Sequence, residues 1–233
     1  MARLPRLFLP GHAQHLVQRG HNGGAVFVDA IDRARYLAWL SDALRERGAA
    51  LHAYALLETR TQLLVSAPSA QAASAAMQAM GRRYARHFND RHGRSGTPWE
   101  GRYRSTVVAD DALLLACYRH VDLAAVRAGL VEHPAAWDWS SYLHHVGRRA
   151  DATVTDHARY WSLGNTPFER QAAYERLCAE PTDAAADALI EDRTINGWAL
   201  GEPAPGARPS RRAARRKAGR PARPARDPGA DPV

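Results

Sequence analysis

The residues of this chain best suited to chemistry on another molecule are arginines interleaved with aromatic side chains between positions 82 and 104. This stretch holds seven arginines and only two acidic residues. Arginine binds phosphate groups and aromatic rings stack on bases, so the combination is typical of a nucleic-acid-binding surface. A solvated helix face is the simpler interpretation of the same charges. The candidate DNA-binding residues of the stretch are Arg82, Arg83, Arg86, Trp99, Arg102 and Arg104.

Metal and redox chemistry have little support in the sequence. The histidines, among them His52, His87 and His92, are scattered without a second ligand at metal spacing. The two cysteines, Cys117 and Cys178, are too few for a disulfide framework or a cysteine-rich zinc site. We therefore expect no metal cofactor and a reducing, cytoplasmic location. No apolar run approaches the roughly 20 residues of a membrane-spanning helix, so we also expect no membrane association.

The net charge of +8 is concentrated at the C-terminal end of the sequence. Residues 207–233 hold eight arginines, one lysine and two aspartates, which sum to +7, so residues 1–206 carry only +1. A basic segment rich in Pro, Ala and Arg, with almost no large apolar residues, cannot build a core and favours a polyanion as partner. We expect residues 202–233 to form a disordered basic tail.

Local sequence signals predict the elements that would position these side chains. Asp29 can cap a helix, and the apolar stretches beyond Gly48 are separated by only three residues (58–60), which predicts a tight hairpin. The order of elements, strand-helix-strand-strand-helix-strand with one extra helix, indicates an α+β fold: a ferredoxin-like antiparallel sheet with helices on one face. The expected strands cover 12–19, 51–57, 61–66 and 101–108, and the expected helices cover 30–47, 70–92 and 110–128.

Composition divides the chain into three parts. We expect a DNA-binding domain over 1–147, a small C-terminal helical extension over 148–201 and the basic tail over 202–233. Within the extension, Thr166, Pro167 and Glu169 supply a helix cap, a first-turn proline and a capping-box acid.

Several motifs, in their order and spacing, resemble the REP-associated tyrosine transposases, a branch of the single-tyrosine HUH transposases of the insertion-sequence type. The most specific match is the run GTPWEGRYRS at 96–105. The other matching segments are 6–12, 18–20, 81–84, 88–89, 126–131 and 139–142, and the pattern continues to about residue 201.

The resemblance implies a dimeric, cytoplasmic DNA-binding protein whose catalytic domain has the ferredoxin-like plan. The family's chemistry uses a His-x-His pair that binds Mg²⁺ or Mn²⁺, a helix tyrosine that becomes linked to a DNA phosphate, and a polar residue one turn later. At the matching positions this sequence has Arg60 and Gln62, then His120, then Ala124. All four chemical positions differ although the flanking motifs are kept. The comparison with the family therefore predicts loss of the metal and of catalysis.

Two residues offer ways to retain some function at these positions. Tyr118 is a substitute nucleophile, but it lies two residues before His120, about 200° around a helix, and so faces elsewhere. Arg60 could pair with the DNA phosphate in place of the metal. The simpler interpretations are that Arg60 points to solvent at a hairpin end and that His120 is a neutral, hydrogen-bonded side chain.

The sequence thus predicts a DNA-binding protein of the tyrosine transposase family that has lost catalysis and binds structured or single-stranded DNA such as palindromic repeats. The alternatives are an active transposase that uses Tyr118, a ferredoxin-like RNA-binding module, and a decaying gene product without selected activity. The expected partners are single-stranded or hairpin DNA and a second copy of the chain, and the expected location is the cytoplasm, in association with the nucleoid.

Overall fold

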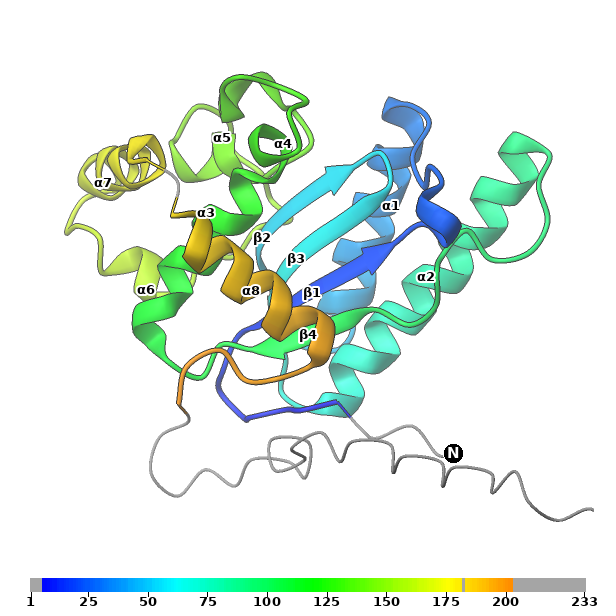
Figure 1. Ribbon diagram of the computed structural model, residues 1–233, viewed down its shortest axis with the longest axis horizontal. Coiled ribbons are helices and arrows are strands. Elements are labelled where there is room, and N and C mark those ends of the chain that lie inside the picture. The colour runs from blue at the N-terminus through cyan, green and yellow to red at the C-terminus, as the bar shows by residue number, and fades with distance from the viewer. Residues whose placement is uncertain (1–5, 182, 203–233) are drawn as a thin grey trace, which may run out of the picture.

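A four-stranded antiparallel sheet forms the centre of the computed structural model, which describes residues 6–181 and 183–202. The strand order is β2-β3-β1-β4, and each neighbouring pair is antiparallel, which confirms the predicted α+β, ferredoxin-like class (Figure 1). The segment expected to be a basic tail lies, beyond residue 202, outside the described residues. The strands are β1 (Gln14–Arg19), β2 (Ala50–Leu57), β3 (Arg60–Ser66) and β4 (Arg104–Val107).

The predicted hairpin is confirmed as the β2–β3 pair. Leu57 pairs with Arg60, so the connection is the two residues Glu58 and Thr59. The predicted strand at 101–108 is shorter in the structure, where β4 covers only Arg104–Val107. Gly101 has a φ of 142°, a conformation outside the strand region that L residues rarely adopt, so the strand does not begin there.

Two long helices cover one face of the sheet (Figure 1). Helix α1 (Ala30–Arg45) begins at Asp29, whose carboxylate accepts hydrogen bonds from the first-turn amides. Helix α2 (Ala70–His92) begins at Ser69 and ends at Gly93, which has a φ of 60°. Both helices match the predicted ones to within two residues.

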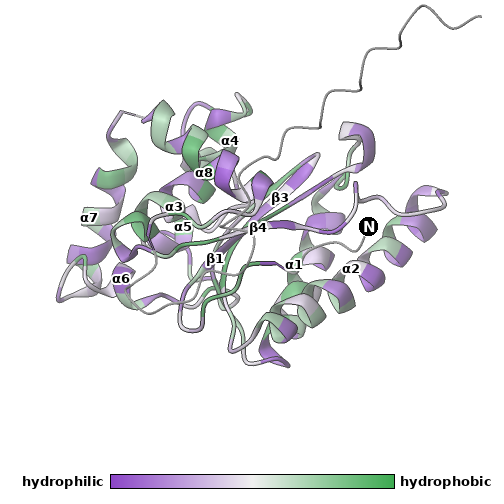
Figure 2. Ribbon diagram, turned by 60° about the horizontal axis from the view of Figure 1, so that its bottom comes forward, coloured by the Kyte–Doolittle hydropathy of each residue, from purple (hydrophilic) through white to green (hydrophobic). Residues whose placement is uncertain are grey.

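The core on this face is rich in aromatic side chains. Tyr36 of α1 and Tyr84 of α2 meet with ring centroids 5.2 Å apart, and both are fully buried. The hydropathy colouring shows mainly polar residues on the outer sides of α1 and α2 (Figure 2). These two amphipathic helices therefore bury their apolar stripes against the sheet and leave charged residues in solvent.

The remaining helices lie on the opposite side of the sheet, where those within residues 114–127 and 184–196 contact its strands (Figure 1). The helix predicted at 110–128 is interrupted, because Asp111–Leu113 form a 3-10 turn and Leu123 has a non-helical ψ of 7°. It therefore appears as α3 (Leu114–Asp122) and α4 (Ala124–Arg127). The elements after it are α5 (Tyr142–His145), α6 (Ala158–Trp161), α7 (Pro167–Ala179) and α8 (Ala184–Asn196), and two further 3-10 turns are His21–Gly23 and Pro134–Ala136.

Residues of the expected C-terminal extension share a core with the sheet. Tyr174 of α7 and Ile190 of α8 belong to the same apolar cluster as Leu64 of β3. The capping box predicted at the start of α7 is present, with Thr166 and Glu169 in reciprocal hydrogen bonds. None of the described helices is long and apolar enough to cross a membrane.

The buried carboxylate of Asp122 connects the helices that form this apolar cluster. Asp122, at the end of α3, lies 2.5 Å from the Ser141 hydroxyl, 2.7 Å from His145 Nδ1 and 2.7 Å from the Tyr174 hydroxyl. Three groups from two segments satisfy the carboxylate, two at the ends of α5 and one on α7, so both segments are held against α3.

Candidate nucleic-acid interface and the closed site beside it

The structure brings three of the four family positions to one place, between the sheet and α8. Arg60 and Gln62 lie two residues apart on β3 and so point to the same face, the one that α3 covers. His120 comes from α3 and lines the same cavity as both of them. The cavity measures only about 10 Å³, which is about the space of one water molecule.

Helix α8 supplies an acidic partner to each of the two basic side chains at this place. Arg60 NH1 lies 3.6 Å from Glu191 Oε1, and His120 Nδ1 lies 2.5 Å from Asp187 Oδ1. Arg127 reaches the same Asp187 carboxylate at 3.5 Å. We call this arrangement the closed site, because acidic side chains of α8 pair with the basic side chains that would otherwise be able to contact a ligand.

The surroundings of His120 disfavour its charged form. It is 1% exposed, and burial lowers its pKa while the hydrogen bond to Asp187 partly opposes that shift. His15 of β1 contacts it edge-on, with ring centroids 5.3 Å apart, and burial holds the pKa of His15 well below its usual range. The prediction of a hydrogen-bonded His120 is confirmed. The contact between His15 and His120 was not predicted, because no feature of the sequence indicates it.

Ala124 and Tyr118 provide no substitute chemistry. Ala124, at the first residue of α4, is fully buried in the apolar cluster. Tyr118 is also fully buried, and its hydroxyl accepts a hydrogen bond of 3.1 Å from the His157 amide. Its ring packs beside Tyr160 and Tyr174. Burial raises its pKa far above the ordinary value, so a phenolate at this position is strongly disfavoured.

The closed site does not fit Mg²⁺. Within the described chain, the side chains of His15, Gln62 and His120 that line this cavity offer two imidazole rings and only one amide oxygen, whereas Mg²⁺ prefers oxygen ligands. The guanidinium groups of Arg60 and Arg127 lower the pKa of His15 by their positive charge and would oppose any further cation, Mn²⁺ included. Within 6–181 and 183–202, no three His, Cys, Asp or Glu side chains gather as a metal site.

The candidate DNA-binding residues of 82–104 fall on separate surfaces. Arg82, Arg83 and Arg86 are exposed on the outer side of α2, where the Arg83 guanidinium lies 4.6 Å from the Trp39 ring centroid. Arg102 and Arg104 are exposed beside and on β4, the edge strand.

Trp99 requires a correction, because it is 4% exposed and cannot stack on a base. Its ring lies in the core, with its centroid 5.7 Å from that of Tyr84 and 6.1 Å from that of Tyr36. A single tryptophan after a helix gives no sequence signal that separates a core residue from a surface one.

Comparison with solved structures identifies a known fold that this chain resembles. No family model and no curated protein matches this chain. The chain is similar to a solved structure of a REP-associated tyrosine transposase bound to a REP hairpin, with a TM-score of 0.52 and 15% identity over 68% of this chain and 96% of that chain. It also matches a Deinococcus radiodurans protein assigned as a transposase, with a TM-score of 0.37 and 19% identity over 49% and 92% of the two chains, a likeness too low to support an argument. The first match shows that this chain has a transposase-like fold.

Proposed function

We propose that this protein is a non-catalytic DNA-binding member of the tyrosine transposase family and that it binds structured or single-stranded DNA such as palindromic repeats. The fold likeness to a transposase bound to a REP hairpin supports the choice of partner. The exposed arginines on α2 and beside β4 supply the positive charge that phosphate binding requires.

The closed site is the observation that carries the non-catalytic part of the proposal. Phosphodiester cleavage needs a nucleophile and positive charge that both reach the scissile phosphate. Here Arg60 is paired with Glu191, His120 is hydrogen-bonded to Asp187, and α8 covers both. The pairing of Arg60 with Glu191 supports a role for Arg60 in closing this site.

The burial of Tyr118 argues against the active alternative, because a phosphate cannot reach a hydroxyl that is fully enclosed and already hydrogen-bonded. The RNA-binding alternative is separated from DNA binding by the experiment below. Homodimer formation and association with the nucleoid belong to the same proposal.

The proposal is tested by sequencing the DNA that co-purifies with the tagged full-length protein, followed by fluorescence anisotropy with a hairpin from the enriched set. We expect palindromic repeats to be enriched and the hairpin to bind about tenfold or more tighter than a linear duplex of equal composition. No enrichment together with equal affinities would contradict the proposal. Tighter binding of the same hairpin made as RNA would favour the RNA-binding module instead.

A further inference from the structure

Two large aromatic side chains are exposed where α6 and α7 meet the solvent. Phe168, the second residue of α7, is 82% exposed, and Trp161, the last residue of α6, is 53% exposed. Phe168 is the most exposed large apolar side chain among the described residues. Scattered exposed apolar residues are ordinary, whereas two aromatic rings within one small unit are typical of an interaction surface.

A hollow of about 430 Å³ lies beside Phe168. It is lined by Leu163, Gly164, Phe168, Glu169, Ala172 and Arg176. We call these six residues, together with Trp161, the α6–α7 surface. Because Ala172 is small, the hollow stays open along α7 and has room for a bulky side chain from another molecule. The α6–α7 surface thus carries both an exposed aromatic ring and a hollow that can receive one.

Contacts beneath the α6–α7 surface fix it in place before any partner binds. The buried Arg170 guanidinium lies 4.2 Å from the Trp161 ring centroid and donates a hydrogen bond of 3.2 Å to the Gly164 carbonyl oxygen. A side chain at position 164 has no room, since its Cβ would lie 2.5 Å from Glu169 Cβ. Glu169 also forms the capping box with Thr166 that begins α7. A surface that is already ordered loses less conformational entropy on association.

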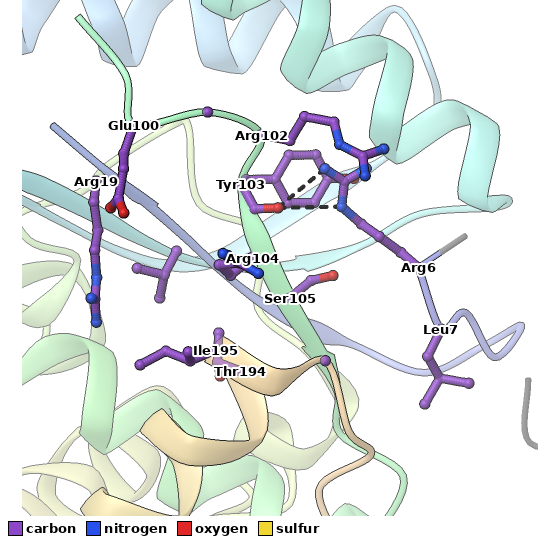
Figure 3. A pocket seen from close by; sticks show the side chains of 13 residues that line it. Arg6, Leu7, Arg19, Glu100, Arg102, Tyr103, Arg104, Ser105, Thr194 and Ile195 are labelled. Atoms are coloured by element: carbon purple, nitrogen blue, oxygen red, sulfur yellow. Dashed lines mark hydrogen bonds between the residues drawn. The ribbon is translucent and has the colours of Figure 1, made fainter. Parts of the chain in front are cut away.

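The charge of the hollow indicates which kind of partner it fits. Among the described residues, one acid, Glu169, and one base, Arg176, line it, so its net charge is zero. The pocket beside β4 differs, because four arginines and a single acid of the described chain line it and give a net charge of +3 (Figure 3). Phosphate binding requires positive charge, so the α6–α7 surface favours a protein partner over DNA.

The features of the α6–α7 surface are complementary to one another. In a dimer with a twofold axis both subunits use the same surface, so each feature must meet its complement on an identical copy. Here an exposed Phe168 adjoins a hollow, and Glu169 and Arg176, with opposite charges, line that hollow. A second copy turned by 180° can therefore place its aromatic ring over this hollow and its basic side chain near this acid. Residues 1–206 carry a net charge of only +1, so the folded parts of two copies repel each other weakly.

We propose that two copies of this chain form a twofold-symmetric dimer through the α6–α7 surface, with Phe168 as the central anchor. Interface hot spots are enriched in aromatic residues and arginine that fill well-packed hollows at the centre of an interface. The inference rests on the homodimer included in the proposed function and assigns the surface that forms it. Helix α2 lies on the other side of the sheet from α6 and α7, so its arginines stay accessible in both subunits (Figure 1, Figure 2). The dimer therefore presents two DNA-binding surfaces to one DNA molecule.

Sedimentation equilibrium of the full-length protein, at about 0.15 M salt and over about a hundredfold range of concentration, measures the association. The interface variant is Phe168→Ser, which removes the aromatic ring without leaving a cavity, because the side chain is exposed. The matched control is Ile31→Ser. Ile31 is likewise the second residue of its helix and is 53% exposed, and α1 lies on the other side of the sheet from α7.

We expect the wild type to dimerise and Phe168→Ser to raise the dissociation constant of the dimer about tenfold or more, as for the loss of a central aromatic anchor. An Arg176→Glu variant should raise it about three- to tenfold, because the new carboxylate would face Glu169 of the partner subunit, and added salt should reduce this effect. Ile31→Ser should stay within about twofold of the wild type.

Fluorescence anisotropy with two DNA probes separates this inference from the proposed function. The wild type should bind a probe of two tandem hairpins about tenfold or more tighter than a single hairpin, because the second contact is made within one complex. Phe168→Ser should keep the affinity for the single hairpin and lose the gain for the tandem probe.

A wild type that stays monomeric over the whole concentration range would overturn the inference, and so would a Phe168→Ser variant that dimerises as the wild type does. Neither result affects binding of the single hairpin, whose absence would instead refute the proposed DNA-binding function. Circular dichroism spectra and thermal unfolding of each variant show whether a loss of association reflects loss of the fold.

Discussion

His52 is a buried histidine whose two ring nitrogens are both engaged. Its Nδ1 lies 2.7 Å from the Thr155 carbonyl oxygen, and its Nε2 lies 2.9 Å from the Ser66 hydroxyl. Burial lowers its pKa to about 4, although the hydrogen bond to Thr155 partly opposes the shift. His52 is therefore neutral in the folded protein at pH values where the unfolded chain already binds a proton.

We predict that the free energy of unfolding falls as the pH is lowered from about 6.5 to about 4, because in this window the unfolded state binds more protons than the folded state. A His52→Gln variant should lose up to about 1.4 kcal/mol per pH unit of this dependence. Urea unfolding curves at a series of pH values measure it. An exposed control, His21→Gln, should keep the wild-type slope, and an unchanged slope in His52→Gln would show that other groups cause the effect.

The two sides of helix α2 have different roles: the buried side stabilises the fold, and we propose that the exposed side binds DNA. Its buried stripe of Met77, Met80, Tyr84 and Phe88 packs on the sheet, and its arginines lie on the opposite, exposed side. The stripe holds the helix in place, so the exposed side is free to vary with little effect on the fold.

Replacing Arg82, Arg83 and Arg86 together by alanine should weaken DNA binding while the free energy of unfolding changes by about 1 kcal/mol or less, most of it from the interaction of Arg83 with Trp39. Each phosphate that the variant no longer neutralises should lower the salt slope by about 0.7–0.9. Salt-dependent anisotropy and urea unfolding measure the two effects. Unchanged affinity and slope would show that this side of α2 is only solvated.

The elements were predictable from sequence where local signals determine them. The hairpin between β2 and β3 followed from a link too short for any other connection, and α2 followed from its cap at Ser69, its apolar stripe and Gly93. The break at Leu123 was missed, because its conformation depends on packing and carries no Gly or Pro signal. Glu191 and Asp187 were also missed as partners of the closed site, since only the tertiary fold brings α8 over β3 and α3.

At the scale of the whole molecule, the sheet separates two apolar cores, and its β4 edge adjoins a pocket lined by Arg6, Arg19, Arg102 and Arg104. Helix α8 contributes both to the closed site and to a wall of that pocket. The C-terminal residues 207–233 add a charge of +7, which favours sequence-independent attraction to DNA. We therefore infer that DNA binds at surfaces that surround a site closed to chemistry.

The central claim is that the protein binds hairpin DNA without cutting it, and denaturing gel electrophoresis of end-labelled hairpin DNA tests this most directly. The DNA is incubated with full-length protein, with and without Mg²⁺ or Mn²⁺, at concentrations where anisotropy shows it to be bound. We predict intact DNA and no covalent adduct for the wild type and for Tyr118→Phe alike, because Tyr118 is enclosed and His120 is paired with Asp187. A covalent protein–DNA adduct that is absent in Tyr118→Phe would contradict this claim and identify Tyr118 as the nucleophile of an active transposase.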